Sequence, residues 1–307
     1  TPEKAEEILR EGFANMVSMA RPFLADPDFA RKAREQKSNE INTCIACNQA
    51  CLDQIFSGKT ASCLVNPRAC KESVTNAAPP KVLRANAPKI AVIGAGPAGL
   101  SAATELAAMG REVHLFEASG EIGGQFNMAK KIPGKEEFHE TLRYFDKMIE
   151  KNGVKLHLNT RVDAEFLIQN NFRQVVLSTG VVPRNLHIEG IDHPKVMSYL
   201  DVLLHGKAVG EKVAIIGAGG IGFDVATFLT EAELQGSPIS NYQSEWGIDR
   251  QYDHRGGITK SQPEISPRQV WLLQRSKGKV GERLGKTTGW AHRLTLKSRK
   301  VQMWNEV

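Results

Sequence analysis

Apolar residues of this chain concentrate in short continuous runs, and two of these runs end at glycine-rich turns. The first run covers residues 89–93, the second covers residues 212–216, and a helix-length segment follows each turn. The turns consist of Gly94, Ala95, Gly96, Pro97, Ala98 and Gly99, and of Gly217, Ala218, Gly219, Gly220, Ile221 and Gly222. A buried strand, a tight glycine turn and a helix bind a dinucleotide pyrophosphate at the helix amino terminus. The pattern therefore predicts an α/β fold with two Rossmann-like domains.

The residues after the first turn support the dinucleotide prediction. A second apolar run, residues 112–116, ends on Glu117, which lies 23 positions beyond Gly94. A carboxylate that binds the ribose of the cofactor is expected at about this distance. The loop at residues 120–125 follows directly, and its paired glycines mark a turn whatever its use.

The remainder of this domain is predicted from periodicity. An amphipathic helix is expected from Glu136 to Asn152, with Gly153 as its cap. Residues 154–158 alternate like a strand. Residues 174–180 read as a buried strand that ends in a turn of small residues.

The second nucleotide-binding unit lacks the acid that the first one carries. Its next strand, residues 269–274, follows a long polar insertion over residues 235–268 and ends at Arg275, Ser276 and Lys277. An acid at this position favours NAD, whereas cations suit the extra phosphate of NADP. The sequence therefore favours NADPH. The alternative is that Arg275 and Lys277 are solvated surface charges.

Four of the five cysteines lie in a single window. Two, three and eleven residues separate Cys44, Cys47, Cys51 and Cys63. This spacing favours an iron-sulfur cluster, which needs four thiolates around a small cube. Three of the cysteines lie close together, and a short loop leads to the fourth. A structural zinc, which usually binds two short-spaced pairs, and a disulfide framework are the alternatives. Cys70 is interpreted as a packed or spare thiol.

The amino-terminal residues fit the last unit of a (β/α)8 barrel. A helix is predicted from Thr1 to Glu11, followed by a short strand at residues 16–19 and a helix from about Asp28 to Glu35. In such a barrel Arg21 would follow strand eight, at the end where a phosphate commonly binds. The alternative is that Arg21 pairs with a surface carboxylate.

Length and composition are those of a globular enzyme. The chain has 307 residues, of which 41% are hydrophobic, and a formal net charge of +6. Because the basic residues are dispersed, phosphorylated cofactors explain this charge and no nucleic-acid partner is predicted. No apolar run could cross a bilayer and no signal sequence is recognised, so we expect a cytoplasmic protein without membrane contact. The chain starts at Thr1 and stops at Val307 as a strand pattern begins, which predicts a piece of a longer polypeptide.

The order of these motifs carries a resemblance to a known family. The residues that carry it are Met19 to Phe23, the four clustered cysteines and the two glycine turns. Over essentially its full length the chain resembles the iron-sulfur flavoprotein branch of the old yellow enzyme family, to which the NADPH-dependent bacterial 2,4-dienoyl-CoA reductases belong. The predicted segments are the end of an FMN-binding (β/α)8 barrel at 1–40, an iron-sulfur segment at 41–75, a linker at 76–88, an FAD-binding domain at 89–205 and an incomplete NADPH-binding domain at 206–307.

The resemblance implies four cofactors and the residues that bind them. Ala20 and Arg21 would hold the phosphate of FMN, and the four cysteines would ligate a 4Fe-4S cluster. Glu117 and the first glycine turn would hold FAD. Additional FAD contacts would come from Gly124, Gln125, Val162, Thr179 and Gly180. The second glycine turn and residues 275–277 would hold NADPH.

The resemblance also implies a function. NADPH would deliver hydride to FAD, electrons would pass singly through the cluster to FMN, and FMN would reduce a conjugated enoyl thioester. The chain would be the electron-input part of an NADPH-dependent 2,4-dienoyl-CoA reductase, which acts on unsaturated acyl-CoA in fatty acid β-oxidation. We expect it to be inactive on substrate by itself, because the first seven strands of the barrel and their acid residues are absent. No residue of this chain is predicted to be catalytic.

Three other functions fit the same motifs. Another enoate reductase or an amine dehydrogenase would share the layout. An electron-transfer subunit similar to the small subunit of glutamate synthase also joins cysteine clusters to two nucleotide folds, although residues 16–27 argue against it. A non-enzymatic, zinc-stabilised binding module is the third. The sequence does not predict an oligomeric state.

Overall fold

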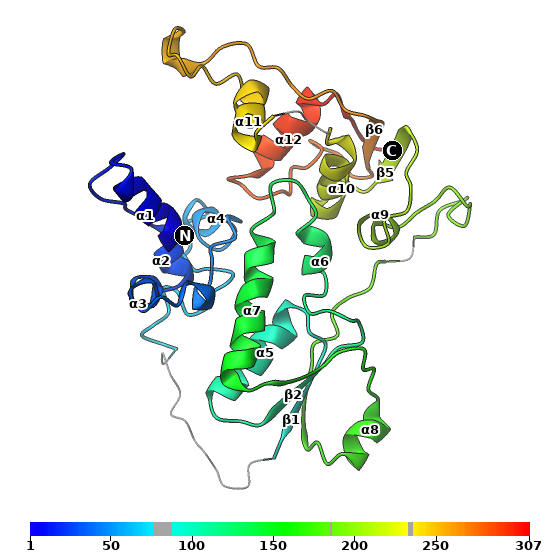
Figure 1. The fold of residues 1–307 in the computed structure, drawn as a ribbon. Helices are drawn as coiled ribbons and strands as arrows, with labels where there is room; N and C mark the ends of the chain where they lie inside the picture. The colour runs from blue at the N-terminus through cyan, green and yellow to red at the C-terminus, as the bar shows by residue number, and fades with distance from the viewer. Residues whose placement is uncertain (76–87, 185, 233–235) are drawn as a thin grey trace. The chain divides into compact units, whose positions relative to one another are not determined.

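The chain folds into two compact units, which are seen in a computed structural model that describes residues 1–75, 88–184, 186–232 and 236–307. Unit 1 contains residues 1–130 and 135–191, and unit 2 contains residues 131–134 and 192–307 (Figure 1). The predicted linker at residues 76–88 lies outside the described residues except for Pro88. None of the helices in the described ranges combines the length and the apolar composition needed to cross a membrane.

A four-stranded parallel sheet forms the centre of unit 1, and its strands lie in the order β3-β2-β1-β4. The strands are β1 (Ile90–Ile93), β2 (Val113–Phe116), β3 (Lys155–His157) and β4 (Gln174–Leu177). Ile90 lies opposite Val113 on one side and Gln174 on the other. Because the strands are parallel, the segments that follow them meet at one edge of the sheet. That edge carries the first glycine turn.

Helices cover the sheet and close the core of unit 1. They are α5 (Pro97–Ala108), α6 (Phe126–Ala129), α7 (Phe138–Asn152) and α8 (Ala164–Gln169). The predicted amphipathic helix is confirmed as α7, and it ends at Gly153, whose φ of 69° is left-handed. Leu142 and Phe145 of α7 pack against the core cluster that contains buried Leu100 of α5, and the two helices lie side by side in Figure 1.

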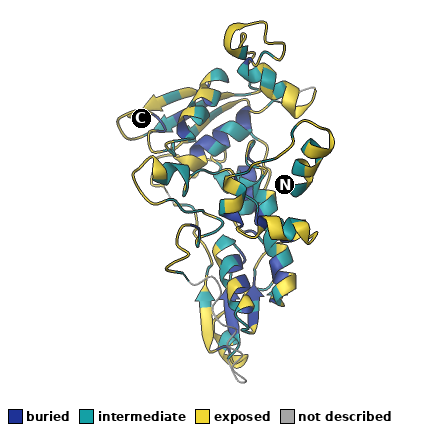
Figure 2. Ribbon diagram, turned by 90° about the vertical axis from the view of Figure 1, so that its left-hand side faces the viewer, coloured by how far each residue is buried: buried dark blue, intermediate teal, exposed yellow. Residues whose placement is uncertain are grey.

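The prediction that residues 174–180 form a buried strand is wrong in its burial. The strand exists as β4, but Val175 is 40% exposed and Leu177 is 77% exposed. β4 is the last strand of the sheet among the described residues, whereas β1 has a neighbour on both sides. In Figure 2 the strands of this sheet carry both buried and exposed residues. Apolar composition shows which environment a strand prefers, but it does not show whether another element covers that strand.

The amino-terminal part of unit 1 consists of short helices. They are α1 (Pro2–Arg10), α2 (Arg21–Ala25), α3 (Phe29–Arg34), the 3-10 helix η1 (Ser38–Glu40) and α4 (Leu52–Ile55). The helices predicted at residues 1–11 and 28–35 are confirmed as α1 and α3, and the Thr1 hydroxyl accepts a hydrogen bond from the Lys4 amide. The strand predicted at residues 16–19 does not form. A strand needs a neighbour to pair with, and no described strand pairs with this segment.

A three-stranded parallel sheet in the order β5-β6-β7 forms the centre of unit 2. Its strands are β5 (Lys212–Ile216), β6 (Gln269–Gln274) and β7 (Gln302–Asn305), and its helices are α9 (Tyr199–Leu203), α10 (Gly220–Thr230), α11 (Pro238–Trp246), the 3-10 helix η2 (Arg255–Gly257) and α12 (Gly289–Ser298). Phe223, Leu272 and Leu296 form its fully buried core. The strands predicted on either side of the insertion are confirmed as β5 and β6.

The polar insertion before β6 is anchored by a buried arginine. Arg299, which follows α12, is 7% exposed and lies 2.6 Å from the carboxylate of Glu264 and 3.8 Å from that of Glu245. Burial raises the pKa of Glu245, and the Arg299 charge opposes that shift. The described part of the insertion is therefore attached to the helices of unit 2 through charged groups that are mostly removed from water.

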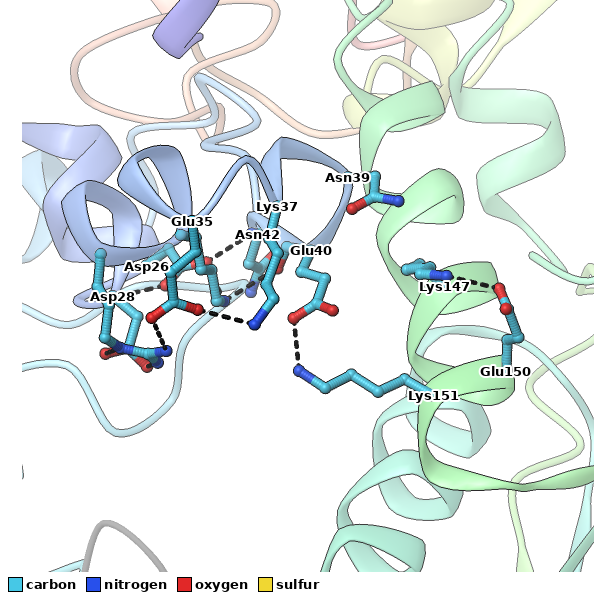
Figure 3. Close-up of polar contacts among 12 residues, drawn as sticks. Asp26, Asp28, Glu35, Lys37, Asn39, Glu40, Asn42, Lys147, Glu150 and Lys151 are labelled. Atoms are coloured by element: carbon cyan, nitrogen blue, oxygen red, sulfur yellow. Dashed lines mark hydrogen bonds and ion pairs between the residues drawn. The ribbon is translucent and has the colours of Figure 1, made fainter.

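An ion pair connects the amino-terminal segment of unit 1 to α7. The Lys151 ammonium of α7 contacts the Glu40 carboxylate of η1 (Figure 3). The Glu40 side chain is 12% exposed and that of Lys151 is 47% exposed. The hydrogen bond from Lys151 lowers the pKa of Glu40 below its ordinary value of 4.5.

This pair predicts a pH-dependent contribution to stability. Because the pKa of Glu40 is lower in the folded chain, the contribution is present above about pH 4.5 and is lost as the pH falls through the folded value. We expect Glu40→Gln to lower the free energy of unfolding by about 0.5–1 kcal/mol at neutral pH and by less in acid. Denaturant unfolding of both proteins at about pH 7 and pH 3.5 measures the difference. Glu150→Gln is the control, because Glu150 pairs with Lys147 inside α7. An equal loss of unfolding free energy at both pH values would contradict a contribution from the ionised Glu40 carboxylate.

Candidate functional site

The first glycine turn needs its glycines for two close approaches. Gly94 has a φ of 99°, and a Cβ atom there would lie 2.5 Å from the carbonyl oxygen of Ser178. A Cβ atom on Gly99 would lie 1.8 Å from the carbonyl oxygen of Gly94. Both neighbours are backbone atoms. A side chain at Gly94 would therefore push the turn away from β4, and a side chain at Gly99 would push α5 away from the turn.

The start of α5 is left open by this turn. Gly96 is the N-cap residue, Pro97 and Ala98 begin the helix, and no side chain of the described chain caps it. The first N–H groups of a helix have no partner within the helix, and together with the helix dipole they attract an anion. The turn can therefore accept the pyrophosphate of a dinucleotide, as its sequence predicts.

The Glu117 carboxylate lies directly beside the first turn. One of its oxygens accepts a hydrogen bond from the Ala95 amide at 2.7 Å, and the other accepts from the amide and hydroxyl of Ser119, both at 2.9 Å. The end of β2 is thereby joined to the glycine turn. The predicted turn and the predicted ribose-binding acid are adjacent in the fold.

The predicted loop at Gly124 and Gln125 folds back onto the first turn. A Cβ atom on Gly124 would lie 3.0 Å from the Cα atom of Gly96. The Gln125 amide donates to the carbonyl of Val181 at 3.4 Å, directly after Thr179 and Gly180. These segments therefore meet at the carboxyl edge of the sheet.

Val162 has different surroundings from the other predicted FAD contacts. It packs in an apolar cluster with Phe116 and Phe172.

The sequence did not indicate Ser178, whose hydroxyl donates to the carbonyls of Ile93 at 2.8 Å and Gly94 at 3.1 Å. The feature that could have indicated Ser178 is its position, since it is a small polar residue at the end of a predicted strand.

The second glycine turn lines an open pocket in unit 2. The predicted residues in its wall are Gly217, Ala218, Gly219, Arg275, Ser276 and Lys277. The sequence did not single out the other wall residues, Gln274, Glu282 and Arg283. Gly220, Ile221 and Gly222 form the first turn of α10, and no side chain of the described chain caps that helix. The pocket thus combines a helix amino terminus with three cationic side chains and one acid.

All four clustered cysteines line a single small pocket in unit 1, and all are free thiols. Burial raises the pKa of the Cys47 and Cys63 thiols, and hydrogen bonds from backbone groups oppose that shift. Gln49 supplies the bond to Cys47, and Val65 and Asn66 supply those to Cys63. Hydrogen bonds to sulfur stabilise thiolates and are a feature of iron-sulfur sites.

Arg21 lines the cysteine pocket as well, which the sequence did not indicate. Ala20 is the N-cap residue of α2, and the Arg21 guanidinium donates to the side-chain oxygen of Asn48 at 2.6 Å. Asn48 follows Cys47, so the predicted phosphate-binding residue contacts the cysteine loop itself.

Within the described ranges, no three histidine, cysteine, aspartate or glutamate side chains form a site for a single metal ion.

Comparison with known proteins shows a family match and similarities that cover most or all of this chain. Residues 88–255 match the family described as pyridine nucleotide-disulphide oxidoreductase. The chain is 31% identical to a metal reductase of Desulforamulus reducens, over 100% of this chain and 45% of that protein. It is 34% identical to a bilirubin reductase of Mediterraneibacter gnavus, over 78% of this chain and 37% of that protein.

A solved structure is similar over the whole chain. The structure of a 2-naphthoyl-CoA reductase in complex with 2-naphthoyl-CoA aligns with a TM-score of 0.83 and 28% identity, covering 100% of this chain and 41% of that one. The present chain therefore spans less than half the length of these relatives.

Proposed function

The chain belongs to the pyridine nucleotide-disulphide oxidoreductase family, and we propose that it is the electron-input part of a flavin-dependent NAD(P)H oxidoreductase. The observation that carries this proposal is the four-cysteine pocket, which lies in the same unit as the first glycine turn. The family match covers this turn and supports dinucleotide binding there. The similarity to reductases over the full chain supports the reductive direction.

Unit 1 would bind FAD through its own backbone and one acid. The uncapped N–H groups of α5 would bind the pyrophosphate, and Glu117, whose carboxylate lies beside the turn, would accept hydrogen bonds from the ribose hydroxyls. Gly124 lies against Gly96 and Gln125 lies near Gly180, so both can approach a cofactor that occupies the turn.

We propose an iron-sulfur cluster and not a zinc ion for the cysteine pocket, because three of its cysteines form one short-spaced run. A zinc ion draws four sulfurs to one point at about 2.3 Å. A 4Fe-4S cluster binds four sulfurs to separate iron atoms on the outside of a cube, so its ligands line a hollow. The four cysteines line one pocket, and backbone groups bond to two of their sulfurs. When bound, such a cluster supplies one-electron transfer between flavins.

The substrate we propose is a conjugated enoyl thioester, an unsaturated acyl-CoA, reduced by an FMN-containing partner domain. The sequence resemblance to the 2,4-dienoyl-CoA reductases is the basis of this choice, and the structural similarity to an acyl-CoA reductase supports it. Arg21, the first residue of α2, which donates to Asn48 of the cysteine loop, would bind the FMN phosphate. Amine oxidation by the same layout is the alternative, and comparing 2,4-dienoyl-CoA with secondary amines as substrates of the complete protein would decide between them.

Cofactor analysis of the anaerobically purified chain tests the proposal. We expect about four iron and four sulfide per chain, the content of a cubane cluster held by four thiolates, together with bound FAD. Iron, acid-labile sulfide, zinc and extracted flavin would be measured on one sample. Zinc without sulfide would contradict electron transfer and leave a structural metal site in a chain with two nucleotide folds.

The pocket in unit 2 predicts a preference for NADPH over NADH. Arg275→Ala should weaken NADPH binding roughly tenfold or more, because a charged hydrogen bond contributes more than 1.4 kcal/mol, and should leave NADH binding nearly unchanged. Titration of each nucleotide by fluorescence measures the two affinities. Lys212→Ala is the matched control, since Lys212 is an exposed cation at the opposite end of β5. Equal weakening of both nucleotides would show that Arg275 does not read the extra phosphate.

A further inference from the structure

Arg143, on α7, joins the cysteine segment to the first nucleotide-binding domain. Its guanidinium donates to the carbonyl oxygens of Asn39 at 2.5 Å and Ile41 at 2.8 Å, and to the Thr43 hydroxyl at 3.3 Å. Thr43 immediately precedes Cys44. We propose that Arg143 is a positioning residue that fixes the loop entering the cysteine pocket relative to the first glycine turn.

The contact set matches the shape of a guanidinium. Arginine presents five N–H donors in a rigid plane and can bond several acceptors at once, whereas lysine concentrates its donors on one nitrogen. Glu140, one turn earlier on α7, accepts from the Nε atom of Arg143 at 2.7 Å. The same carboxylate lies 3.4 Å from the Thr43 hydroxyl. Arg143 is therefore held in place by its own helix while it binds the loop.

The opposite side of α7 connects to the glycine turn. Leu142, Phe145 and Ile149 pack in the core cluster that contains Leu100 of α5. α5 begins inside the first glycine turn. Arg143 therefore links the cysteine loop to the turn through two packed helices, without a long loop between them. Since electron transfer falls steeply with distance between cofactors, this link would set a distance on which the proposed function rests.

Two further ion pairs join the same parts of unit 1. Lys151 of α7 contacts Glu40 (Figure 3), and Arg68 contacts Glu105 of α5. These pairs attach the segment as a whole, so we expect it to stay docked when Arg143 is replaced. The loss should then be confined to the loop that contains Thr43.

Hydrogen exchange on the full chain tests the inference. Arg143→Met keeps the length of the side chain and removes its donors. We expect the backbone amides of Glu40, Ile41 and Asn42, which donate to Lys37, Ser38 and Asp26, to exchange roughly tenfold faster, the loss of about one charged hydrogen bond, while the amides of α5 and the FAD content stay unchanged. Lys147→Met is the matched control, because Lys147 lies one turn away on α7 and pairs with Glu150 of the same helix.

Iron loss to a chelator supplies the second measurement. It should accelerate in Arg143→Met and not in Lys147→Met, and Thr43→Val, a substitution of nearly equal volume, should show a smaller effect of the same kind. Unchanged exchange in Arg143→Met, or loss of protection throughout unit 1, would overturn the positioning role. The exchange measurement does not depend on which metal is bound. A wild-type chain that holds zinc would therefore refute the proposed function and leave this inference open to the same test.

Discussion

Replacing Gly99 with alanine should abolish FAD binding and destabilise unit 1. The added Cβ atom would lie 1.8 Å from the Gly94 carbonyl oxygen and 2.6 Å from the Ser178 hydroxyl, so α5 would have to move away from the turn. We expect bound flavin to fall more than tenfold and the free energy of unfolding to fall by about 1–3 kcal/mol, the usual cost of overpacking. Flavin extracted per chain and denaturant unfolding measure the two effects.

Substitutions at two other glycines distinguish an effect on folding stability from an effect on FAD binding. Gly96 has a φ of −73° and no atom within 4 Å of an added Cβ atom, so Gly96→Ala should keep the stability within about 0.5 kcal/mol. Its methyl group would instead meet the pyrophosphate, and flavin binding should fall. Gly210→Ala, which also meets no atom within 4 Å, should change neither quantity. Normal flavin content in Gly99→Ala would show that FAD binds elsewhere.

Replacing Cys47 with serine should remove nearly all the iron. A cubane cluster needs four thiolates, and a serine hydroxyl stays protonated at neutral pH and is a poor ligand for iron. Cys47 is half-buried in the pocket wall, so an exogenous thiol would not easily replace its sulfur. We expect less than about a tenth of the wild-type iron and sulfide, measured anaerobically together with the visible absorbance of the cluster.

Cys70 provides the matched control for the cysteine experiment. It is exposed and is not part of the pocket wall, so Cys70→Ser should keep its full iron content. Full iron in Cys47→Ser would show that the four-cysteine pocket does not hold the metal. Equal loss in both variants would indicate that the iron is bound without selectivity among the thiols.

Elements that depend on local chemistry could be predicted from the sequence. Both glycine turns lie where the strand-turn-helix pattern puts them. Only glycine fits at Gly99 and Gly222, because a Cβ atom on Gly222 would lie 1.9 Å from the carbonyl oxygen of Gly217, as one on Gly99 would lie against that of Gly94. α7 follows from its apolar stripe and from Gly153, which adopts the left-handed conformation at its end.

Features that depend on distant partners could not be predicted. Residues 16–19 have the composition of a strand, but pairing needs a second strand that their own sequence cannot supply. β4 has an apolar sequence, yet Leu177 is exposed, because exposure depends on whether another element covers the strand. The contact of Arg21 with Asn48 joins residues 27 positions apart, and no periodicity connects them.

The site residues that could not be predicted from the sequence also depend on partners far away along the chain. Arg283 reaches the unit 2 pocket from a loop beyond β6, and Arg143 reaches Asn39 across 104 positions. An isolated arginine in a sequence indicates a surface charge as readily as a ligand. The three-dimensional arrangement distinguishes the two, because it shows which acceptors surround the guanidinium.

The short segment at residues 131–134 affects how the protein can be divided. It belongs to unit 2, although the residues on both sides of it belong to unit 1. Lys131 of this segment donates to the carbonyl of Leu203 in unit 2 at 2.7 Å. Dividing the gene after the codon for residue 191 would therefore give a first product that carries this loop without its partners and a second product that lacks four residues of unit 2. Excised single domains are poor substitutes for the intact chain in any assay of nucleotide binding.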